Sequence, residues 1–276
     1  MIYDVPGTQI MGILNITEDS FSDGGQYLQV EAALAHAELL LSQGANIIDV
    51  GGESTRPGAT RVAEQVELQR VIPVVTELHA RGVTVSVDTM RSNVAAAAVA
   101  AGADLINDVS GGLADPNMLT VVAETGVPVC LMHWETEKFG NAAGAAHTRE
   151  SVVADVVAKL QKLVDAAVHA GIAPEAISLD PGLGFAKTAE DNWELLRALD
   201  TLQSLGFPLL IGASRKRFLQ ALGGDVDAAT ATLSAYLADA DTWCVRVHNV
   251  AATAASLQVA RQLHRIPNRD TYRWKK

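Results

Sequence analysis

Polar side chains gather at the ends of short apolar runs in this sequence. In the stretch LINDVSGG (105–112), Asn107 and Asp108 directly follow the apolar pair Leu105 and Ile106. An unpaired polar group inside an apolar strand costs roughly 2–7 kcal/mol, so these residues require partners. Comparable residues end other apolar runs along the chain: Asn15, Asp88, Asp180, Ser214, Lys216, Arg246 and His248. The recurrence indicates one shared polar site.

Two of these residues have side chains suited to phosphate. Arg246 and His248 are two apart in one strand-like run, so their side chains point to the same side. Arginine binds phosphate oxygens in bidentate fashion, and histidine can donate to them. A salt bridge between Arg246 and an acidic neighbour is the alternative interpretation, which the sequence leaves open. A single Asp after a strand is also commonly a cap or turn residue, and Asp108 fits that role because alternation turns it away from Asn107.

The remaining polar residues suit a nitrogen-rich ring. The carboxylates of Asp88 and Asp180 and the amide of Asn107 can accept hydrogen bonds from several N–H donors on a flat heterocycle. Asn15 could ligate Mg²⁺ that is held mainly by phosphate oxygens. The chain contains no Ser-His-Asp order, zinc-ligand spacing or phosphate-binding P-loop. The pattern therefore predicts a site that positions a phosphorylated heterocycle and stabilises a leaving group.

The elements that must position these residues are β-branched apolar runs alternating with helical stretches. Eight runs predict strands: 10–15, 46–51, 83–88, 104–108, 128–133, 177–180, 208–213 and 244–248. Such alternation favours an α/β fold of the (β/α)8 TIM-barrel type, in which all carboxyl ends of the strands meet at one mouth. A doubly wound open sheet is the rival, but no Gly-rich GxGxxG turn follows the first run.

Helix boundaries can also be predicted. Helices are expected over 30–43 before Gly44, over 151–170 before Gly171, and from Thr188 onward. Asp115-Pro116 predicts an N-cap followed by a first-turn proline, and Pro73 is expected to kink or divide a helix over 61–80. No linker or repeat interrupts the pattern, so we expect a single domain over 1–276, with the barrel at about 10–260 and a C-terminal tail at 261–276.

Composition narrows the class of protein. The chain has 276 residues, 49% hydrophobic and 5% aromatic, which suits a helix-rich α/β protein. Its net charge of −11 argues against nucleic-acid or anionic-membrane partners. Cys130 and Cys244 each lie in an apolar run and predict buried free thiols. With no apolar run of 18 residues and no signal-peptide pattern, we expect a cytoplasmic protein without a membrane span.

Several motifs in order resemble the dihydropteroate synthase family of folate biosynthesis. They are MGILNITEDSFSDGG (11–25), DVGGESTRPGA (49–59), VSVDT (85–89), LINDVSGG (105–112), LMH (131–133), LDPGLGFAKT (179–188), GASRKRFL (212–219) and RVHNV (246–250). The resemblance covers residues 10 to about 260. It implies a TIM barrel, a homodimer and a Mg²⁺-dependent transferase. The expected reaction joins 6-hydroxymethyl-7,8-dihydropterin diphosphate to p-aminobenzoate, giving 7,8-dihydropteroate and diphosphate, and sulfonamides compete at the p-aminobenzoate pocket.

The resemblance also implies roles for individual residues. The pterin ring would contact Asp88, Asn107, Asp180 and Lys216. Without the resemblance, the place of Lys216 in the loop after the seventh predicted strand suggests a phosphate ligand instead. The diphosphate would contact Thr55, Arg246 and His248, with Mg²⁺ at Asn15. The p-aminobenzoate pocket would be shaped by Phe21, Arg56, Pro57, Phe185, Lys187 and Ser214. The residues expected to act in catalysis are Asp23, which would stabilise a cation formed after diphosphate leaves, Arg56 and Lys216.

Some positions depart from the family pattern. Asn249 stands where the family commonly has Asp, and Ala186 stands where Gly is frequent. Neither change removes a group assigned above. Two rival functions remain, a pterin-binding methyltransferase and a non-catalytic paralogue that binds pterins. The first would not need the SRK motif (214–216), and the second would be expected to lack Asn15, Arg246 or His248, all of which are present.

Overall fold

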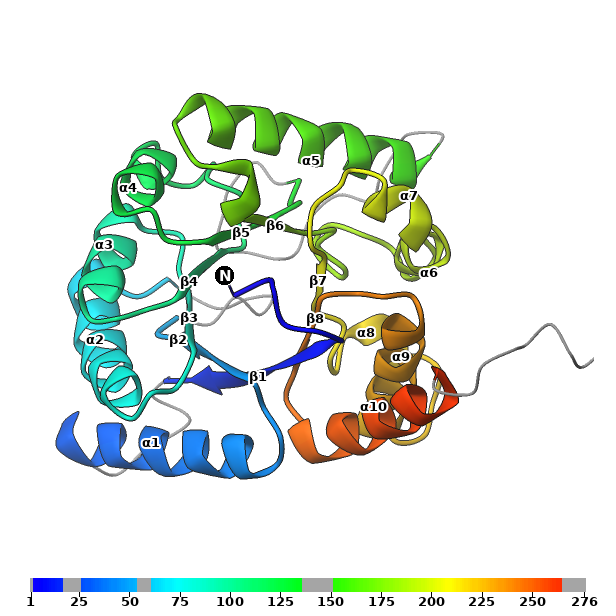
Figure 1. Ribbon diagram of the computed structural model, residues 1–276, viewed down its shortest axis with the longest axis horizontal. Helices are drawn as coiled ribbons and strands as arrows, with labels where there is room; N and C mark the ends of the chain where they lie inside the picture. Colours follow the sequence, from blue (N-terminus) through cyan, green and yellow to red (C-terminus); the bar gives the residue numbers. More distant parts are fainter. Residues whose placement is uncertain (1, 17–25, 54–60, 136–150, 265–276) are drawn as a thin grey trace, which may run out of the picture.

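The computed structural model describes residues 2–16, 26–53, 61–135 and 151–264, and these form a barrel of parallel strands surrounded by helices (Figure 1). The eight predicted strands are confirmed with small shifts of their ends. They are β1 (Gln9–Asn15), β2 (Ile47–Gly51), β3 (Val85–Asp88), β4 (Leu105–Asp108), β5 (Val129–Met132), β6 (Ile177–Asp180), β7 (Leu210–Ile211) and β8 (Cys244–Val247).

Every strand pairs in parallel with its neighbours, in the order β6-β5-β4-β3-β2-β1-β8-β7. The two outer strands of this order meet through a parallel bridge between Leu179 and Leu209, and the Leu179 N–H donates to the Pro208 carbonyl at 2.9 Å. The sheet is therefore nearly closed on itself, and the TIM-barrel prediction is correct. Closure brings the carboxyl ends of all eight strands to one mouth.

Helices form the outer ring of Figure 1. They are α1 (Gln26–Ser42), α2 (Glu64–Ala80), α3 (Ser92–Ala100), α4 (Met118–Thr125), α5 (Val152–His169), α6 (Ala189–Arg197), α7 (Leu199–Gln203), α8 (Arg217–Gln220), α9 (Val226–Asp239) and α10 (Val250–His264), with a short 3-10 turn η2 (Pro174–Ala176). As predicted from Thr188, a reciprocal capping box between Thr188 and Asp191 opens α6. None of these described helices is long and apolar enough to cross a membrane.

Two helix predictions require correction. Pro73 does not divide the helix over 61–80, because α2 runs unbroken from Glu64 to Ala80. Its buried face includes Val71, Val74 and Leu78, and each such side chain contributes about 1.5–3 kcal/mol, which outweighs one lost backbone hydrogen bond. Asp115 does not cap α4, which begins at Met118. Its carboxylate accepts a hydrogen bond at 2.8 Å from the Ser92 N–H, at the start of α3, and another at 3.0 Å from the Asn117 N–H, just before α4.

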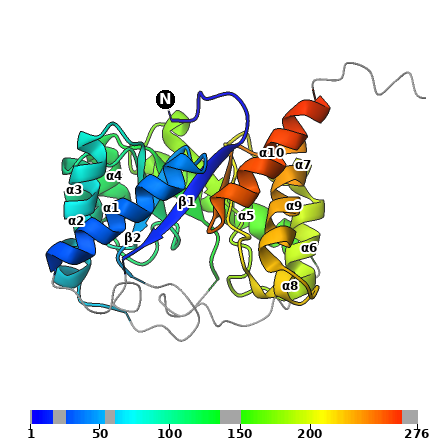
Figure 2. The same ribbon diagram turned by 90° about the horizontal axis from the view of Figure 1, so that it is seen from below.

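The amino end of the barrel is filled by apolar side chains. The interior cluster there contains Met11, Ile47, Leu105, Cys130, Leu210, Trp243 and Cys244. The N-terminal segment crosses this end, as the view down the barrel shows (Figure 1), and Figure 2 shows it at one end of the strands. The Tyr3 hydroxyl donates to the Val129 carbonyl at 3.3 Å, and its ring packs edge-on against Trp243. The amino end is thereby plugged, and the polar residues lie toward the opposite end.

Candidate active site

The change from apolar to polar along the barrel interior follows from strand alternation. Residues two apart face the same side, so the interior positions that begin with Ile47, Leu105 and Cys244 continue with Asp49, Asn107 and Arg246. The first layer is the apolar plug, and the second is polar. The parallel register sets Asp88 beside Asn107, and Asp49 beside Ser86. Three neighbouring strands, β2, β3 and β4, therefore present polar groups next to one another.

Arg246 holds this polar layer together. Its Nε donates to Asp49 Oδ2 at 2.6 Å, and its Nη2 donates to Asp88 Oδ2 at 2.8 Å. Asp49 also accepts hydrogen bonds from Ser86 Oγ at 2.6 Å and from Asn107 Nδ2 at 3.3 Å. The salt bridge that the sequence left as an alternative for Arg246 is thus present. These bonds use two of the five N–H donors of the guanidinium, so the others can face a ligand.

Burial shapes the electrostatics of this layer. Burial raises the pKa of Asp88 to about 7, although the Arg246 guanidinium opposes that change. Burial also works against the charge of Arg246, but the carboxylates of Asp49 and Asp88 outweigh it and raise the Arg246 pKa. The cation is therefore held permanently, while Asp88 can gain or lose a proton near neutral pH. Such a pair can accommodate a ligand with several N–H donors and a negative group.

Asp180, Lys216 and Arg246 converge on a position that lacks a side chain. A Cβ atom placed on Gly212 would lie 3.7 Å from Asp180 Oδ2, 3.9 Å from Lys216 Nζ and 4.0 Å from Arg246 Cβ. Glycine at the carboxyl end of β7 therefore leaves room among three charged groups. Burial lowers the pKa of Lys216 to about 8, despite the nearby Asp180 carboxylate. The Lys216 ammonium also donates to the Leu183 carbonyl.

An aromatic and apolar wall adjoins these charges. The Lys216 ammonium lies 4.7 Å from the centroid of the Phe185 ring, which packs edge-on against Trp134 at 4.9 Å. Met90, Val109, Met132, Trp134 and Ala186 form the apolar cluster against which Phe185 packs. A flat ring held by the polar layer would have this wall as a neighbouring surface.

Lys187 stabilises the turn that carries Phe185. Its ammonium donates to the carbonyls of Gly182 at 3.0 Å and Phe185 at 3.2 Å, and lies 2.9 Å from His133 Nδ1. Burial lowers the Lys187 pKa to about 7. Gly182 has a φ of +69°, and a Cβ there would lie 1.9 Å from the His133 carbonyl oxygen, so only glycine fits. The turn is therefore held in place by Lys187 and by close backbone approach.

Ser214 and His248 meet beside Arg246. Ser214 Oγ lies 2.9 Å from His248 Nδ1 and also accepts a hydrogen bond from the His248 N–H at 3.1 Å. Asn249 points elsewhere and donates to Asp227 Oδ2 at 3.1 Å. Asp227 is also bound by Arg215 at 2.7 Å, and this hydrogen bond lowers the Asp227 pKa to about 2. Asn249 thus supports the loop that carries Ser214 and Lys216.

Asn15 ends β1 at the same mouth. Its Oδ1 would lie 3.4 Å from a Cβ placed on Gly51, whose own Cβ position is 3.7 Å from Asp88 Cβ. Among the described residues, no three His, Cys, Asp or Glu side chains form a cage for a metal ion. A single amide oxygen near an anion site fits Mg²⁺, which commonly keeps its waters and binds substrate phosphates.

The structure brings together the described members of the site predicted from the sequence: Asn15, Asp88, Asn107, Asp180, Phe185, Lys187, Ser214, Lys216, Arg246 and His248. Phe21, Asp23, Thr55, Arg56 and Pro57 lie outside the described residues. Asp108 is a turn residue, as expected, because its carboxylate accepts from the N–H groups of Ser110 and Gly112. Asp49 was missed. Its even spacing from Ile47 was the available signal, since it predicts an inward side chain.

The mouth at the carboxyl end of this (β/α)8 barrel contains paired acids, an arginine and a buried lysine. These features place the protein in the class of barrel enzymes with a polar ligand site at that face. Residues 11–248 match the model of the pterin binding enzyme family. The chain belongs to this family, and within it to the dihydropteroate synthases.

Individual relatives support this assignment. A curated protein named dihydropteroate synthase, from Mycobacterium leprae, is 50% identical over 261 residues, covering 91% of this chain and 92% of its own. A Xanthomonas albilineans dihydropteroate synthase with 4-aminobenzoic acid is 42% identical, with a TM-score of 0.87 and 95% of each chain covered. The same enzyme in complex with 7,8-dihydropteroate is 39% identical, with a TM-score of 0.83 and 95% of each chain covered. The methyltransferase and non-catalytic alternatives are not favoured by these similarities.

Proposed function

We propose that this protein joins 6-hydroxymethyl-7,8-dihydropterin diphosphate to p-aminobenzoate and releases 7,8-dihydropteroate and diphosphate. The proposal rests mainly on one observation: Arg246 forms ion pairs with both Asp49 and Asp88, and Asn107 donates to Asp49 beside them. This layer offers acceptors to the donor edge of a pterin and a fixed cation to its diphosphate. The relatives bound to 4-aminobenzoic acid and to 7,8-dihydropteroate support the two substrate halves.

The pterin would lie in the strand-built part of the site. Asp88, Asn107 and Asp180 accept hydrogen bonds from its ring nitrogens, and Lys216 donates to its acceptor edge. Burial raises the pKa of Asp180, while Lys216 opposes that rise, so each group favours the charge of the other. These side chains come from β3, β4, β6 and the segment after β7, which are rigid supports.

The diphosphate would extend toward Arg246, His248 and Thr55. His248 is oriented for this role by its contacts with Ser214. Asn15 would hold Mg²⁺ together with diphosphate oxygens, and the ion would neutralise negative charge on the leaving group. Removing magnesium with a chelator should therefore lower turnover while the fold is retained. Among the residues that the structure describes, no cluster of three His, Cys, Asp or Glu side chains could hold a structural metal ion.

We propose a dissociative substitution. The bond between the pterin methylene carbon and the diphosphate oxygen breaks first, and the electron pair leaves with diphosphate. Asp23 stabilises the resulting pterin-methyl cation. The neutral amine of p-aminobenzoate then attacks the methylene carbon, forms the C–N bond and loses a proton. A strong general base is unnecessary, because the amine nitrogen is positively charged and acidic once it has formed the new C–N bond.

The p-aminobenzoate half would lie against Phe185, with Phe21, Arg56, Pro57, Lys187 and Ser214 completing its pocket. The Phe185 ring is kept in place by Trp134 on one side and Lys216 on the other. A sulfonamide would compete for this pocket. We also propose a cytoplasmic homodimer. The free thiols of Cys130 and Cys244 are consistent with a reducing compartment, and light scattering after size-exclusion chromatography would test the dimer.

The test uses purified protein with both substrates and Mg²⁺. We expect dihydropteroate by mass spectrometry and one diphosphate released for each product. A pterin substrate carrying ¹⁸O in the bridging position tests the order of events: without p-aminobenzoate, the label should move to non-bridging positions if the carbon–oxygen bond breaks reversibly. No dihydropteroate with all components present would refute the function. The label can move only if the freed diphosphate rotates before it recombines with the cation. Where rotation is possible, product formation without label exchange would refute the dissociative order.

A further inference from the structure

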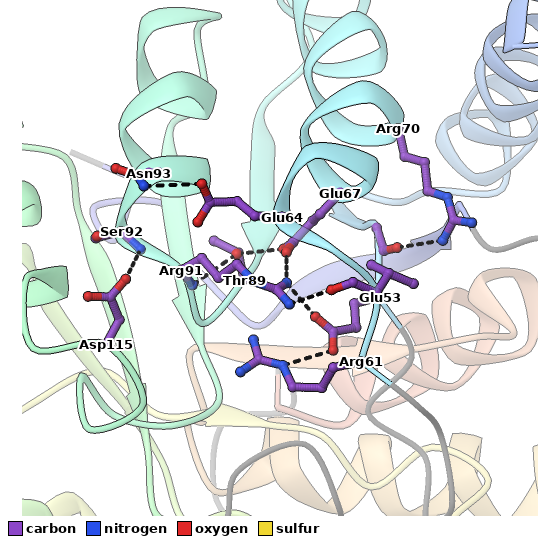
Figure 3. A network of polar contacts seen from close by, with 12 residues as sticks. Glu53, Arg61, Glu64, Glu67, Arg70, Thr89, Arg91, Ser92, Asn93 and Asp115 are labelled. Atoms are coloured by element: carbon purple, nitrogen blue, oxygen red, sulfur yellow. Dashed lines mark hydrogen bonds and ion pairs between the residues drawn. The ribbon is translucent and has the colours of Figure 1, made fainter.

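A cluster of charged side chains lies beside the mouth, between β2, α2 and β3 (Figure 3). It consists of Glu53, Arg61, Glu67 and Arg91, here called the Arg91 network. Glu53 follows β2 and Arg61 precedes α2, so the two residues flank the segment 54–60. Glu53 Oε1 accepts a hydrogen bond from Arg61 Nε at 2.9 Å. The network therefore joins the two flanks of this segment.

Arg91 contacts both flanks directly. Its Nη1 donates to Glu53 Oε2 at 2.6 Å, and its Nη2 donates to the Val62 carbonyl at 2.6 Å. A single guanidinium thus fixes the chain on both sides of residues 54–60. Arg70 adds a further hydrogen bond, from Nη1 to the Gly52 carbonyl at 3.1 Å. The planar fork of arginine presents five N–H donors in a fixed arrangement, and the compact ammonium of lysine does not reproduce that geometry.

Arg91 is in turn held by α2 and by the end of β3. Glu67, which is 1% exposed, forms an ion pair with Arg91 Nη1. The other Glu67 oxygen accepts a hydrogen bond from Thr89 Oγ1 at 2.6 Å. Thr89 directly follows Asp88, the residue that pairs with Arg246. The network therefore connects the pterin-facing strand end to both flanks of the segment 54–60.

The burial of the network indicates a purpose beyond docking α2. The side chains of Arg91 and Glu53 are 14% and 7% exposed, and two guanidiniums balance two carboxylates. An apolar face including Val71, Val75 and Leu78 already packs α2 onto the barrel. Buried ion pairs are weak contributors to stability but can select one geometry. Here the selected geometry is that of the two flanks of the segment 54–60 at the rim of the barrel.

We propose that Arg91 is a positioning residue for the p-aminobenzoate step, acting by holding Glu53 and Val62 in fixed positions. The inference rests on the proposed function, under which Thr55, Arg56 and Pro57 act on the substrates from the segment that these residues flank. Arg91 itself touches neither substrate. Asp88 keeps its own partner, Arg246, so the hydrogen bonds assigned to the pterin ring do not include a member of the network.

The test is Arg91→Met, which keeps the bulk of the side chain and removes its charge and donors. We expect kcat/KM for p-aminobenzoate to fall about 10- to 100-fold, since small misplacements of positioning groups have effects of this size. The Kd for 6-hydroxymethyl-7,8-dihydropterin, which lacks the diphosphate assigned to Thr55, should stay within about threefold of wild type, because its ring partners lie on other segments. Arg91→Lys should recover part of the loss, as it can reach one flank but not both.

The matched control is Arg81→Met at the far end of α2, where Arg81 is exposed and paired with Glu38. It should leave both parameters unchanged. Equal losses in both parameters, a loss that only follows the folded fraction measured by circular dichroism, or no change in Arg91→Met would each overturn the inference. If Arg91→Met does not fold, Glu53→Gln should show the same split with a smaller loss. A wild type without dihydropteroate formation would refute the proposed function instead.

Discussion

Asp49→Asn tests whether the buried carboxylate behind Arg246 orients the site. The Asp49 side chain is 0% exposed and accepts hydrogen bonds from Ser86, Arg246 and Asn107. An asparagine can keep its oxygen toward Arg246 and Asn107 and turn its NH₂ group toward the Ser86 hydroxyl, which can accept. The substitution therefore keeps the shape and most hydrogen bonds, and removes one negative charge.

The expected magnitude follows from that charge. Breaking a buried ion pair by removing one partner typically costs about 3–5 kcal/mol, but Arg246 retains Asp88 at 2.8 Å. Hydrogen bonds to charged groups exceed neutral ones by roughly 1 kcal/mol each, and two such bonds to Asp49 are affected. We therefore expect a loss of about 1–3 kcal/mol in the free energy of unfolding. A comparable loss in binding would weaken the pterin diphosphate Kd by about 10- to 100-fold.

Calorimetric titration of the pterin diphosphate and urea denaturation would measure both effects. Asp104→Asn is the control, because Asp104 is exposed just before β4 and its carboxylate accepts a hydrogen bond from a backbone N–H, that of Val85, at 2.8 Å. It should leave the Kd unchanged. If folded Asp49→Asn binds the pterin diphosphate within about twofold of wild type, a difference of under 0.5 kcal/mol, Asp49 does not orient Arg246 for binding.

Three further predictions follow from the site. Because burial lowers the pKa of Lys216 to about 8, the lysine loses its proton as pH rises through 8, so kcat/KM for the pterin diphosphate should fall above that pH. Lys216→Arg should move this fall above pH 10 in a rate profile, and an unmoved profile would contradict the assignment. Asp88→Ala should weaken pterin binding by more than about 100-fold in calorimetry, since the ring donors would face an apolar wall; normal binding would refute the role. Gly182→Ala should lower stability by about 2–5 kcal/mol in thermal melts, because its Cβ would overlap the His133 carbonyl. Gly206→Ala, with a positive φ of +82° but open space around the added Cβ, should lose only about 1 kcal/mol, and equal losses would disprove the overlap argument.

The strands and their polar ends could be predicted because both depend on local pattern. Each strand is a short apolar run, and alternation decides which residue of a pair such as Asn107 and Asp108 faces inward. The structure bears this out, since Asn107 bonds Asp49 across the interior while Asp108 closes its own turn. Barrel closure then brings distant strand ends together without further information from the sequence.

Long-range pairing was harder to predict. Nothing local to VSVDTMR (85–91) reveals that Arg91 returns to Glu53 and Val62, because those contacts depend on how α2 lies against β3. The same limit explains the error at Asp115, whose carboxylate joins the start of α3 to the turn before α4 and does not cap α4 itself. Sequence spacing identifies candidates for a cap or an ion pair, and packing selects among them.

This division has a consequence for the chemistry of the site. Three of the groups assigned to the pterin, Asp88, Asn107 and Asp180, end strands whose register leaves one arrangement, which suits a ring that must be recognised by several directional hydrogen bonds. The groups assigned to p-aminobenzoate come largely from segments between strands, so their placement depends on side chains such as Arg91 and Lys187 that hold those segments. Substitutions in the strands should therefore change pterin affinity, whereas substitutions in these supporting side chains should change the rate at which the amine attacks. A series in which both classes altered the same kinetic parameter would show that the two halves of the site are not built separately.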